Sequence, residues 1–259
     1  ISKNQLTGIS EKAANGWIHL KNLIMNRNAL LTLPHSSSIW GNSLMLLDLR
    51  CNLLTQIDDE SCHTWNKIKT IQLGSNKLTQ LPLSIKNWIN LIGLYITDNK
   101  ITSLPLELRN CQRLEILHAG VNLLKDLPPE LFGGGSFQFM RDVELYRNKI
   151  VTCPEELGSD MPSLQQLSLS GNAIKSIPVG IGKCSSLREL HFANVAKLGK
   201  VPEELSGCTS LVYLNIAGCP TVKSLPNSLA KSWPQLREVD VRSGGKKEKC
   251  KLTADWIES

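Results

Sequence analysis

One short pattern of aliphatic residues and asparagine recurs through nearly the whole chain. It reads as an aliphatic residue, two variable residues, an aliphatic residue, one variable residue, an aliphatic residue, two variable residues and asparagine, as in segments 68–76 and 164–172. The asparagine falls at positions 4, 28, 52, 76, 99, 122, 148 and 172, so successive steps are 24, 24, 24, 23, 23, 26 and 24 residues. Two further copies carry Val195 and Cys219 where asparagine is due. A regular period of this length predicts stacked structural repeats.

Within each copy, aliphatic positions alternate with variable ones, as a half-buried strand requires. Val143 and Leu145 point to one side of such a strand, and Glu144 and Tyr146 to the other. One repeat cannot bury its apolar side alone, so we expect successive strands to form a parallel sheet over a continuous aliphatic core. The asparagine follows the strand, where its side chain can pair backbone groups of adjacent turns that would otherwise lack partners.

A second motif, an aliphatic residue followed by proline, comes after the asparagine. Proline fixes its own φ angle and disfavours helix in the residue before it, so the turn away from the sheet is preset. The segments that follow are short and can begin with acidic residues, as in 155–157 and 203–205, which suits the start of a helical turn. We therefore expect brief helical or 3₁₀ segments on the side opposite the sheet. The motif occurs as Leu81-Pro82, Leu104-Pro105, Leu127-Pro128, Cys153-Pro154, Ile177-Pro178, Val201-Pro202 and Leu225-Pro226.

These two motifs resemble the leucine-rich repeat family over residues 1–243, most of all its intracellular scaffold members of the scribble, erbin and Ras-group kinds. The resemblance implies an α/β solenoid of about ten repeats, curved as a horseshoe, with a parallel sheet on the concave face and short helical or 3₁₀ segments on the convex face. Residues 244–259 would then form a C-terminal cap or tail. Because Ile1 occupies the last strand position of a repeat, we expect further sequence to precede it.

The pattern departs from its period in two places. The longest step contains three consecutive glycines, 133–135, flanked by phenylalanines that either pack onto the convex core or meet a partner. The repeats beginning at Leu187 and Leu211 each carry one extra residue before the proline, and segment 214–226 looks like the cysteine-bearing repeats of plant-type intracellular receptors. Asn194, beside Val195, is a candidate to supply part of the missing asparagine bonding.

The cysteines occupy repeat positions that predict a structural role. Cys111, Cys184 and Cys208 each stand three residues before the first leucine of a repeat, a slot that Trp65 and Trp88 fill elsewhere. We expect this slot to face the core, where a free cysteine behaves as a small hydrophobe. The chain has no CxxC pair and no Asn-x-Ser/Thr sequon. We therefore expect reduced cysteines in an intracellular, cytoplasmic protein.

Neither a catalytic site nor a membrane span is expected. The chain shows no secretory signal and no apolar run approaching ~20 residues. The five histidines form no HExxH motif, and no cofactor or metal site has a recognised spacing. An open sheet offers neither a pocket that excludes water nor an oxyanion hole, which argues against catalysis. The middle outward column of the strands is predicted to contain Ile24, Asp48, Gln72, Tyr95, His118, Glu144, Ser168, His191, Asn215 and Asp240.

The outward residues of the sheet are the candidate binding site. Tyrosine and arginine supply much of the energy at protein interfaces, and a rigid sheet presents them with little ordering cost. The alternative is that this face is only solvated and that another surface or a flanking domain holds the partner. The candidate partner-binding residues are Tyr95, His118, Glu144, Tyr146, Arg147, His191 and Tyr213.

The resemblance implies a non-catalytic protein-interaction scaffold, or a structural subunit of a larger intracellular assembly, that binds protein on its concave face. One alternative is the sensor or regulatory region of a larger signalling enzyme or receptor. A role with RNA would draw on the net charge of +6, but Asp48, Glu144 and Asp240 in the concave column would repel phosphate. We therefore expect protein partners and no nucleic acid.

Overall fold

The computed structural model describes residues 2–242 and divides the chain into two compact units, residues 1–123 and 124–259. The predicted cap, 244–259, lies outside the described residues. Among the described residues, none belongs to a helix with the length and apolar character needed to cross a bilayer.

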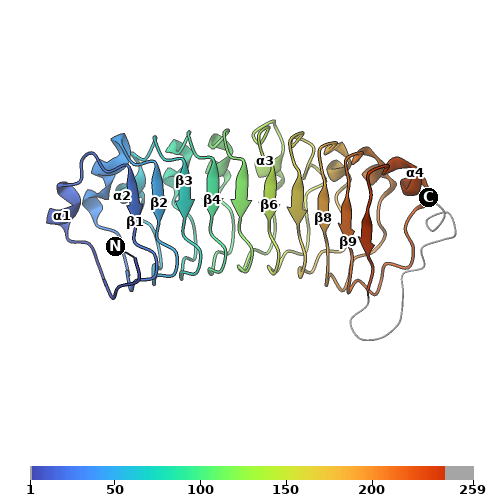
Figure 1. Ribbon diagram of the computed structural model, residues 1–259, viewed down its shortest axis with the longest axis horizontal. Helices are drawn as coiled ribbons and strands as arrows, with labels where there is room; N and C mark the ends of the chain where they lie inside the picture. Colours follow the sequence, from blue (N-terminus) through green and yellow to red (C-terminus); the bar gives the residue numbers. More distant parts are fainter. Residues whose placement is uncertain (1, 243–259) are drawn as a thin grey trace. The chain divides into compact units, whose positions relative to one another are not determined.

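The first unit is a series of parallel strands joined through short helical turns. Strands β1 to β5 pair in sequence order, each with the next (Figure 1). They are β1 (Asn22–Ile24), β2 (Leu46–Asp48), β3 (Thr70–Gln72), β4 (Gly93–Tyr95) and β5 (Ile116–His118). The turns are α1 (Glu11–Asn15), η1 (His35–Asn42), α2 (Asp59–Cys62), η2 (Leu83–Asn87) and η3 (Leu106–Asn110), where η denotes a 3₁₀ helix.

The second unit repeats this organisation. Its strands are β6 (Asp142–Glu144), β7 (Gln166–Ser168), β8 (Glu189–His191), β9 (Tyr213–Asn215) and β10 (Glu238–Asp240), again parallel and in sequence order. Its helical turns are α3 (Pro129–Phe132), η4 (Val179–Lys183), η5 (Glu203–Gly207) and α4 (Asn227–Ser232). The predicted α/β repeat fold is confirmed. The alternation of the sequence places the final strand at 239–241. In the structure β10 begins and ends one residue earlier, which is within the ordinary variation of strand ends.

The aliphatic–proline motif places the helical turns as expected. Proline immediately precedes η2, η3, η4 and η5, with φ angles of −67°, −72°, −59° and −76°. The aliphatic residue before each of these prolines is buried. It therefore packs into the core immediately before the helical turn begins. The core therefore lies between the strands and the helical turns, and strand residues such as Leu94 and Leu190 reach it from the other side.

The asparagine that follows each strand bridges adjacent repeats. The Asn76 side-chain amide donates to the carbonyl oxygens of Leu49 (3.0 Å) and Leu73 (2.9 Å), and its oxygen accepts the backbone N–H of Leu54 (3.1 Å). Asn52, Asn99, Asn122 and Asn172 make the same three kinds of bond. The predicted ladder is confirmed.

The two repeats that lack asparagine differ from each other. Cys219 takes over part of the role, because its thiol donates to the carbonyl oxygen of Phe192 in the preceding repeat (3.0 Å). Asn194 instead contributes through its backbone, whose N–H donates to the carbonyl of Ala217 (2.6 Å). Within the described residues its side chain makes no hydrogen bond, so it does not replace the missing ladder amide at Val195.

A tryptophan or cysteine in one slot ties seven of the described turns to the turn before them. The indole N–H groups of Trp40, Trp65, Trp88 and Trp233 donate to carbonyl oxygens of the preceding turn over 2.9 to 3.2 Å. The thiols of Cys111, Cys184 and Cys208 donate in the same way, to Ile85, Gly158 and Ile181. All three cysteines are buried, as predicted. Because tryptophan and cysteine both donate a hydrogen bond from this slot to a carbonyl oxygen of the preceding turn, either residue type can occupy it.

Thiol accessibility provides a test of this packing. Among the seven described cysteines, Cys51 is exposed, Cys153 is half-buried and the other five are buried. Burial raises the pKa of the thiols of Cys111, Cys184 and Cys208 to about 12, so they stay protonated and unreactive.

In a Cys250→Ser variant, we expect a maleimide at about pH 8 to label one thiol of the native chain rapidly, and the remaining six only after unfolding. Mass spectrometry over time measures both phases. A further Cys51→Ser change should abolish the rapid phase, whereas rapid labelling of Cys111 or Cys208 would contradict the buried slot.

The structure shows which of the phenylalanines near the three glycines pack into the core and which remain exposed to a partner. Phe132 and Phe137 are buried, and their ring centroids lie 6.0 Å apart, so these two pack into the core. Phe139 is 55% exposed. Packing is therefore the correct interpretation for the first two rings and does not extend to the third.

Candidate functional site

The strand register places the predicted outward column as expected within each unit. We call the outward side of the strands the strand face. In the first unit the matched residues are Ile24, Asp48, Gln72, Tyr95 and His118. In the second unit they are Glu144, Ser168, His191, Asn215 and Asp240. The candidate residues Tyr146, Arg147 and Tyr213 lie on or next to the same strands.

On the first unit, Tyr95 and His118 form an aromatic pair. They stand opposite each other on β4 and β5, with ring centroids 5.0 Å apart and an interplanar angle of 85°. Such edge-to-face geometry is favourable between rings. Gly93 makes room for it, because a Cβ there would lie 2.8 Å from the Tyr95 ring. Both rings are half-buried, so their edges remain available to a ligand.

On the second unit, His191 and Tyr213 form a comparable pair. Their ring centroids are 5.2 Å apart, and His191 Nε2 lies 3.3 Å from a carboxylate oxygen of Glu189. Burial raises the pKa of the Tyr213 hydroxyl, and the carboxylates of Asp240 and Glu238 raise it further. Tyr213 therefore stays a neutral phenol that can donate or accept a hydrogen bond.

Glu144, Tyr146 and Arg147 come together at the end of β6. Glu144 stands opposite Ser168 in the register, and the backbone N–H of Arg147 donates to Ser170 (2.7 Å). Arg147 has a left-handed φ of 51° and an exposed side chain. Strand β7 lies between these three residues and His191. The five candidate residues of the second unit therefore form two groups, one of Glu144, Tyr146 and Arg147 and the other of His191 and Tyr213.

Two further pairs of charged residues were missed by the sequence reasoning. Arg50 binds Asp48 through two hydrogen bonds (Nε–Oδ1 3.0 Å and Nη2–Oδ2 2.9 Å), and Arg242 binds Asp240 in the same way (2.9 and 2.6 Å). The signal was available in the sequence, because aspartate precedes arginine by two residues in both 48–50 and 240–242. Two residues along an extended chain return a side chain to the same face.

These pairs hide carboxylates that were expected to be exposed. Asp48 is 4% exposed and Asp240 is 6% exposed. Burial raises the pKa of Asp48, but hydrogen bonds from Arg50 and Asn26 outweigh it, and the pKa falls below its usual value. For Asp240, the hydrogen bond from Arg242 is the largest effect and also lowers the pKa. Both aspartates stay ionised, and their charge is neutralised by the adjacent arginine.

Comparisons with known proteins agree with this geometry. Two family models, both described as leucine-rich repeat, match residues 42–85 and 163–184. A leucine-rich repeat protein of Leptospira interrogans is 26% identical, with a TM-score of 0.73 over 92% of this chain and 64% of that one. The ectodomain of the Arabidopsis thaliana receptor kinase GASSHO1/SCHENGEN3 is 24% identical, with a TM-score of 0.71 over 94% of this chain and 33% of that one.

A third similar structure is the leucine-rich repeat domain of the type III effector XopL, which is 20% identical with a TM-score of 0.68, over 93% of this chain and 75% of that one. No curated protein matches the sequence. The chain thus spans less than two thirds of the Leptospira protein and about one third of the plant ectodomain.

The chain is a leucine-rich repeat protein. Leucine-rich repeat domains generally mediate contacts between proteins and are generally not catalytic. This class agrees with a site made of ring pairs and charged side chains on an open sheet.

Proposed function

We propose that this protein is a non-catalytic scaffold that holds a protein partner on its strand face. The observation that carries this proposal is the presence of ordered aromatic pairs, Tyr95 with His118 and His191 with Tyr213. Each ring is held by its neighbour and by a strand, so binding costs little side-chain entropy. A role as a structural subunit of a larger assembly, as in the scribble and erbin scaffolds, is part of the same proposal.

The chemistry of the face supports a protein ligand. Tyrosine and arginine are enriched among the residues that dominate binding energy, and Tyr146 and Arg147 are adjacent at the end of β6. Arg147 is exposed and can form ion pairs or stack on a partner's ring. Glu144 adds a carboxylate on the same repeat, so the face can select for both charge and shape.

A cytoplasmic setting is also proposed. Support comes from the seven described cysteines, all of which are free thiols. Four of them occupy the tryptophan or cysteine slot or the asparagine position, where each donates a hydrogen bond. Oxidation to disulfides would remove these donors, which favours a reducing compartment. Fluorescence microscopy of the tagged protein in its native cell tests the setting, and accumulation outside the cytoplasm would contradict it.

The double substitution Tyr146→Ala with Arg147→Ala should weaken partner binding at least about thirtyfold, because one such residue alone can contribute about 2 kcal/mol or more at an interface. The melting temperature should stay unchanged, since neither side chain belongs to the buried core. Quantitative mass spectrometry of affinity-captured proteins identifies those lost, and titration of the purified partner then measures Kd.

The matched control is a double substitution on the other side of the repeats, Val179→Ala with Lys183→Ala, two exposed residues of η4. This control should retain the partner. Loss of the same partner with the control alone would place the interface on the helical turns. A fall in melting temperature for Tyr146→Ala with Arg147→Ala would instead give these residues a structural role.

A further inference from the structure

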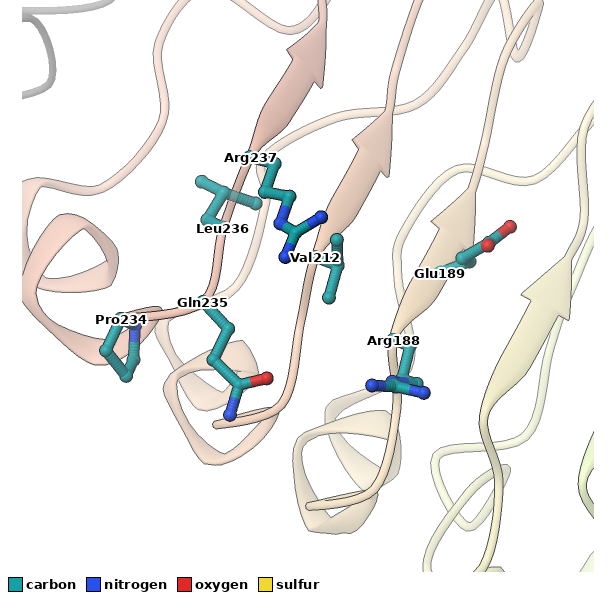
Figure 2. A pocket seen from close by; sticks show the side chains of 7 residues that line it. All are labelled: Arg188, Glu189, Val212, Pro234, Gln235, Leu236 and Arg237. Carbon is teal, nitrogen blue, oxygen red and sulfur yellow. The ribbon is translucent and has the colours of Figure 1, made fainter.

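A charged pocket of about 560 Å³ opens beside the strand face of the second unit, where the chain enters β8, β9 and β10. Figure 2 shows its lining. The guanidinium group of Arg237 extends toward Val212, and the guanidinium group of Arg188 and the amide of Gln235 lie below Val212 in the view. The carboxylate of Glu189 points to the other side of Arg188. Two cationic groups and one amide therefore line the same pocket as an aliphatic side chain.

The repeat register creates this hollow. The backbone N–H of Val212 donates to the carbonyl of Arg188 (2.9 Å), and that of Arg237 donates to the carbonyl of Val212 (2.9 Å). The three residues thus occupy the same position of successive repeats. Arg188 and Arg237 lie two strand spacings apart, or roughly 9.6 Å along the sheet. A short valine between two long arginines leaves a space that the guanidinium groups border.

The two arginines are available to a ligand. Within residues 2–242, neither guanidinium group forms a hydrogen bond or an ion pair with another side chain. Their situation differs from that of Arg50 and Arg242, each of which is held by an aspartate. The nearest lining carboxylate, Glu189, lies against His191 at 3.3 Å. The two guanidinium groups outnumber the single carboxylate of the lining, so the pocket carries a net positive charge.

We propose that this pocket binds one carboxylate side chain, a glutamate or aspartate, in an otherwise neutral segment of a protein partner. This inference rests on the proposed function and adds the chemistry of the partner. The two guanidinium groups supply charged donors to the carboxylate oxygens, and the amide of Gln235 can donate a third hydrogen bond. The apolar surface of Val212 and Leu236 accommodates the methylene groups of the incoming side chain.

A protein carboxylate fits this pocket better than a nucleic-acid backbone does. A polyanion carries a phosphate at every residue, and its neighbouring phosphates would meet Glu189 in the lining and the exposed Glu238 next to Arg237. A single carboxylate between the two arginines places one negative charge near these acidic groups, whereas a nucleic-acid backbone places several. The pocket is therefore matched to one negative charge on an otherwise neutral segment.

The test uses the isolated protein and a small probe, N-acetylglutamate N-methylamide, which carries one glutamate side chain and no terminal charge. Binding is followed by NMR of the arginine Nε–Hε signals, assigned with Arg188→Lys and Arg237→Lys. We expect saturable shifts of the Arg188 and Arg237 signals. The Arg242 signal should not move, because that guanidinium is already bound to Asp240.

The double variant Arg188→Gln with Arg237→Gln should bind the probe about tenfold more weakly, as measured by the shift of the Leu236 and Val212 amide signals. Lys223→Gln with Lys231→Gln is the matched control, since it removes the same charge from exposed positions outside the pocket. This control should bind the probe as the unsubstituted protein does.

Equal shifts with N-acetylglutamine N-methylamide, or unchanged affinity in the arginine double variant, would overturn the carboxylate assignment. A tighter response to inorganic phosphate or to an eight-nucleotide oligo(dT) would overturn the choice of a protein ligand. The probe experiment involves no partner, so its failure leaves the Tyr146 and Arg147 experiment intact. The converse outcome is that the protein binds the probe but the Tyr146→Ala with Arg147→Ala variant loses no partner. That result would contradict the strand-face scaffold and would still support carboxylate binding in the pocket.

Discussion

Replacing Gly207 with alanine should destabilise the protein by about 3 kcal/mol and lower its melting temperature by about 6–12 °C. Gly207 ends η5 and lies against η4 of the preceding repeat. A Cβ on Gly207 would overlap the carbonyl oxygen of Gly182. The atom it meets is backbone, which cannot rotate away as a side chain can. The two helical turns would have to separate, and the apolar core beneath them would open.

Thermal unfolding followed by circular dichroism measures this effect. Gly133→Ala is the control, because a Cβ there would lie 3.6 Å from its nearest neighbour, the carbonyl oxygen of Pro129, which is ordinary contact. The control glycine has φ −103°, an angle open to any residue, so alanine should be tolerated. If both variants melt at the same temperature, close packing of η4 on η5 does not limit stability.

A second large effect on stability is expected when Asn76 is replaced with alanine. The change leaves the buried N–H of Leu54 without its side-chain acceptor. The carbonyl oxygens of Leu49 and Leu73 each lose one of two side-chain donors and keep the amides of the neighbouring ladder asparagines. A buried polar group left without a partner costs about 1–3 kcal/mol. We therefore expect a loss of about 1–3 kcal/mol in the free energy of unfolding, set mainly by the N–H of Leu54.

Urea titration gives this free energy, and hydrogen exchange of the Leu54 amide reports the local loss of protection. Asn110→Ala is the control, since Asn110 is exposed at the end of η3. It should change stability by less than about 0.5 kcal/mol. An Asn76→Ala variant as stable as this control would show that water replaces the ladder bonds, and the asparagine would lose its structural role.

The strands and their register followed from the repeat pattern because each repeat meets its neighbours at equivalent positions. Counting from asparagine to asparagine placed His118 opposite Tyr95, and the register agrees. The ladder bonds of Asn76 were also predictable, since a fixed polar residue after every buried strand has backbone groups within reach. Both predictions follow from the repeat period and from side-chain chemistry alone. The strand register and the asparagine bonds that they describe recur in successive repeats.

The candidate site was predictable only in part. The sequence named both His191 and Tyr213 as candidates, and only the structure shows the contact between their rings. Asp48 and Asp240 were expected to oppose phosphate from an exposed column, but Arg50 and Arg242 bury and neutralise them. The pocket around Val212 was not found, because it depends on the length of one side chain relative to its two neighbours.

The sequence by itself determined the period, the direction of each aliphatic side chain and the residues that hold one repeat to the next. These properties are local or involve adjacent repeats, so a pattern in the chain specifies them. Only the tertiary structure decided which arginines remain available to a ligand. Arg242 folds onto an aspartate two residues away, whereas Arg188 and Arg237 border an open pocket. The reason is physical: the partner of a flexible charged side chain depends on the shape and charge of the surface around it, which the period does not encode.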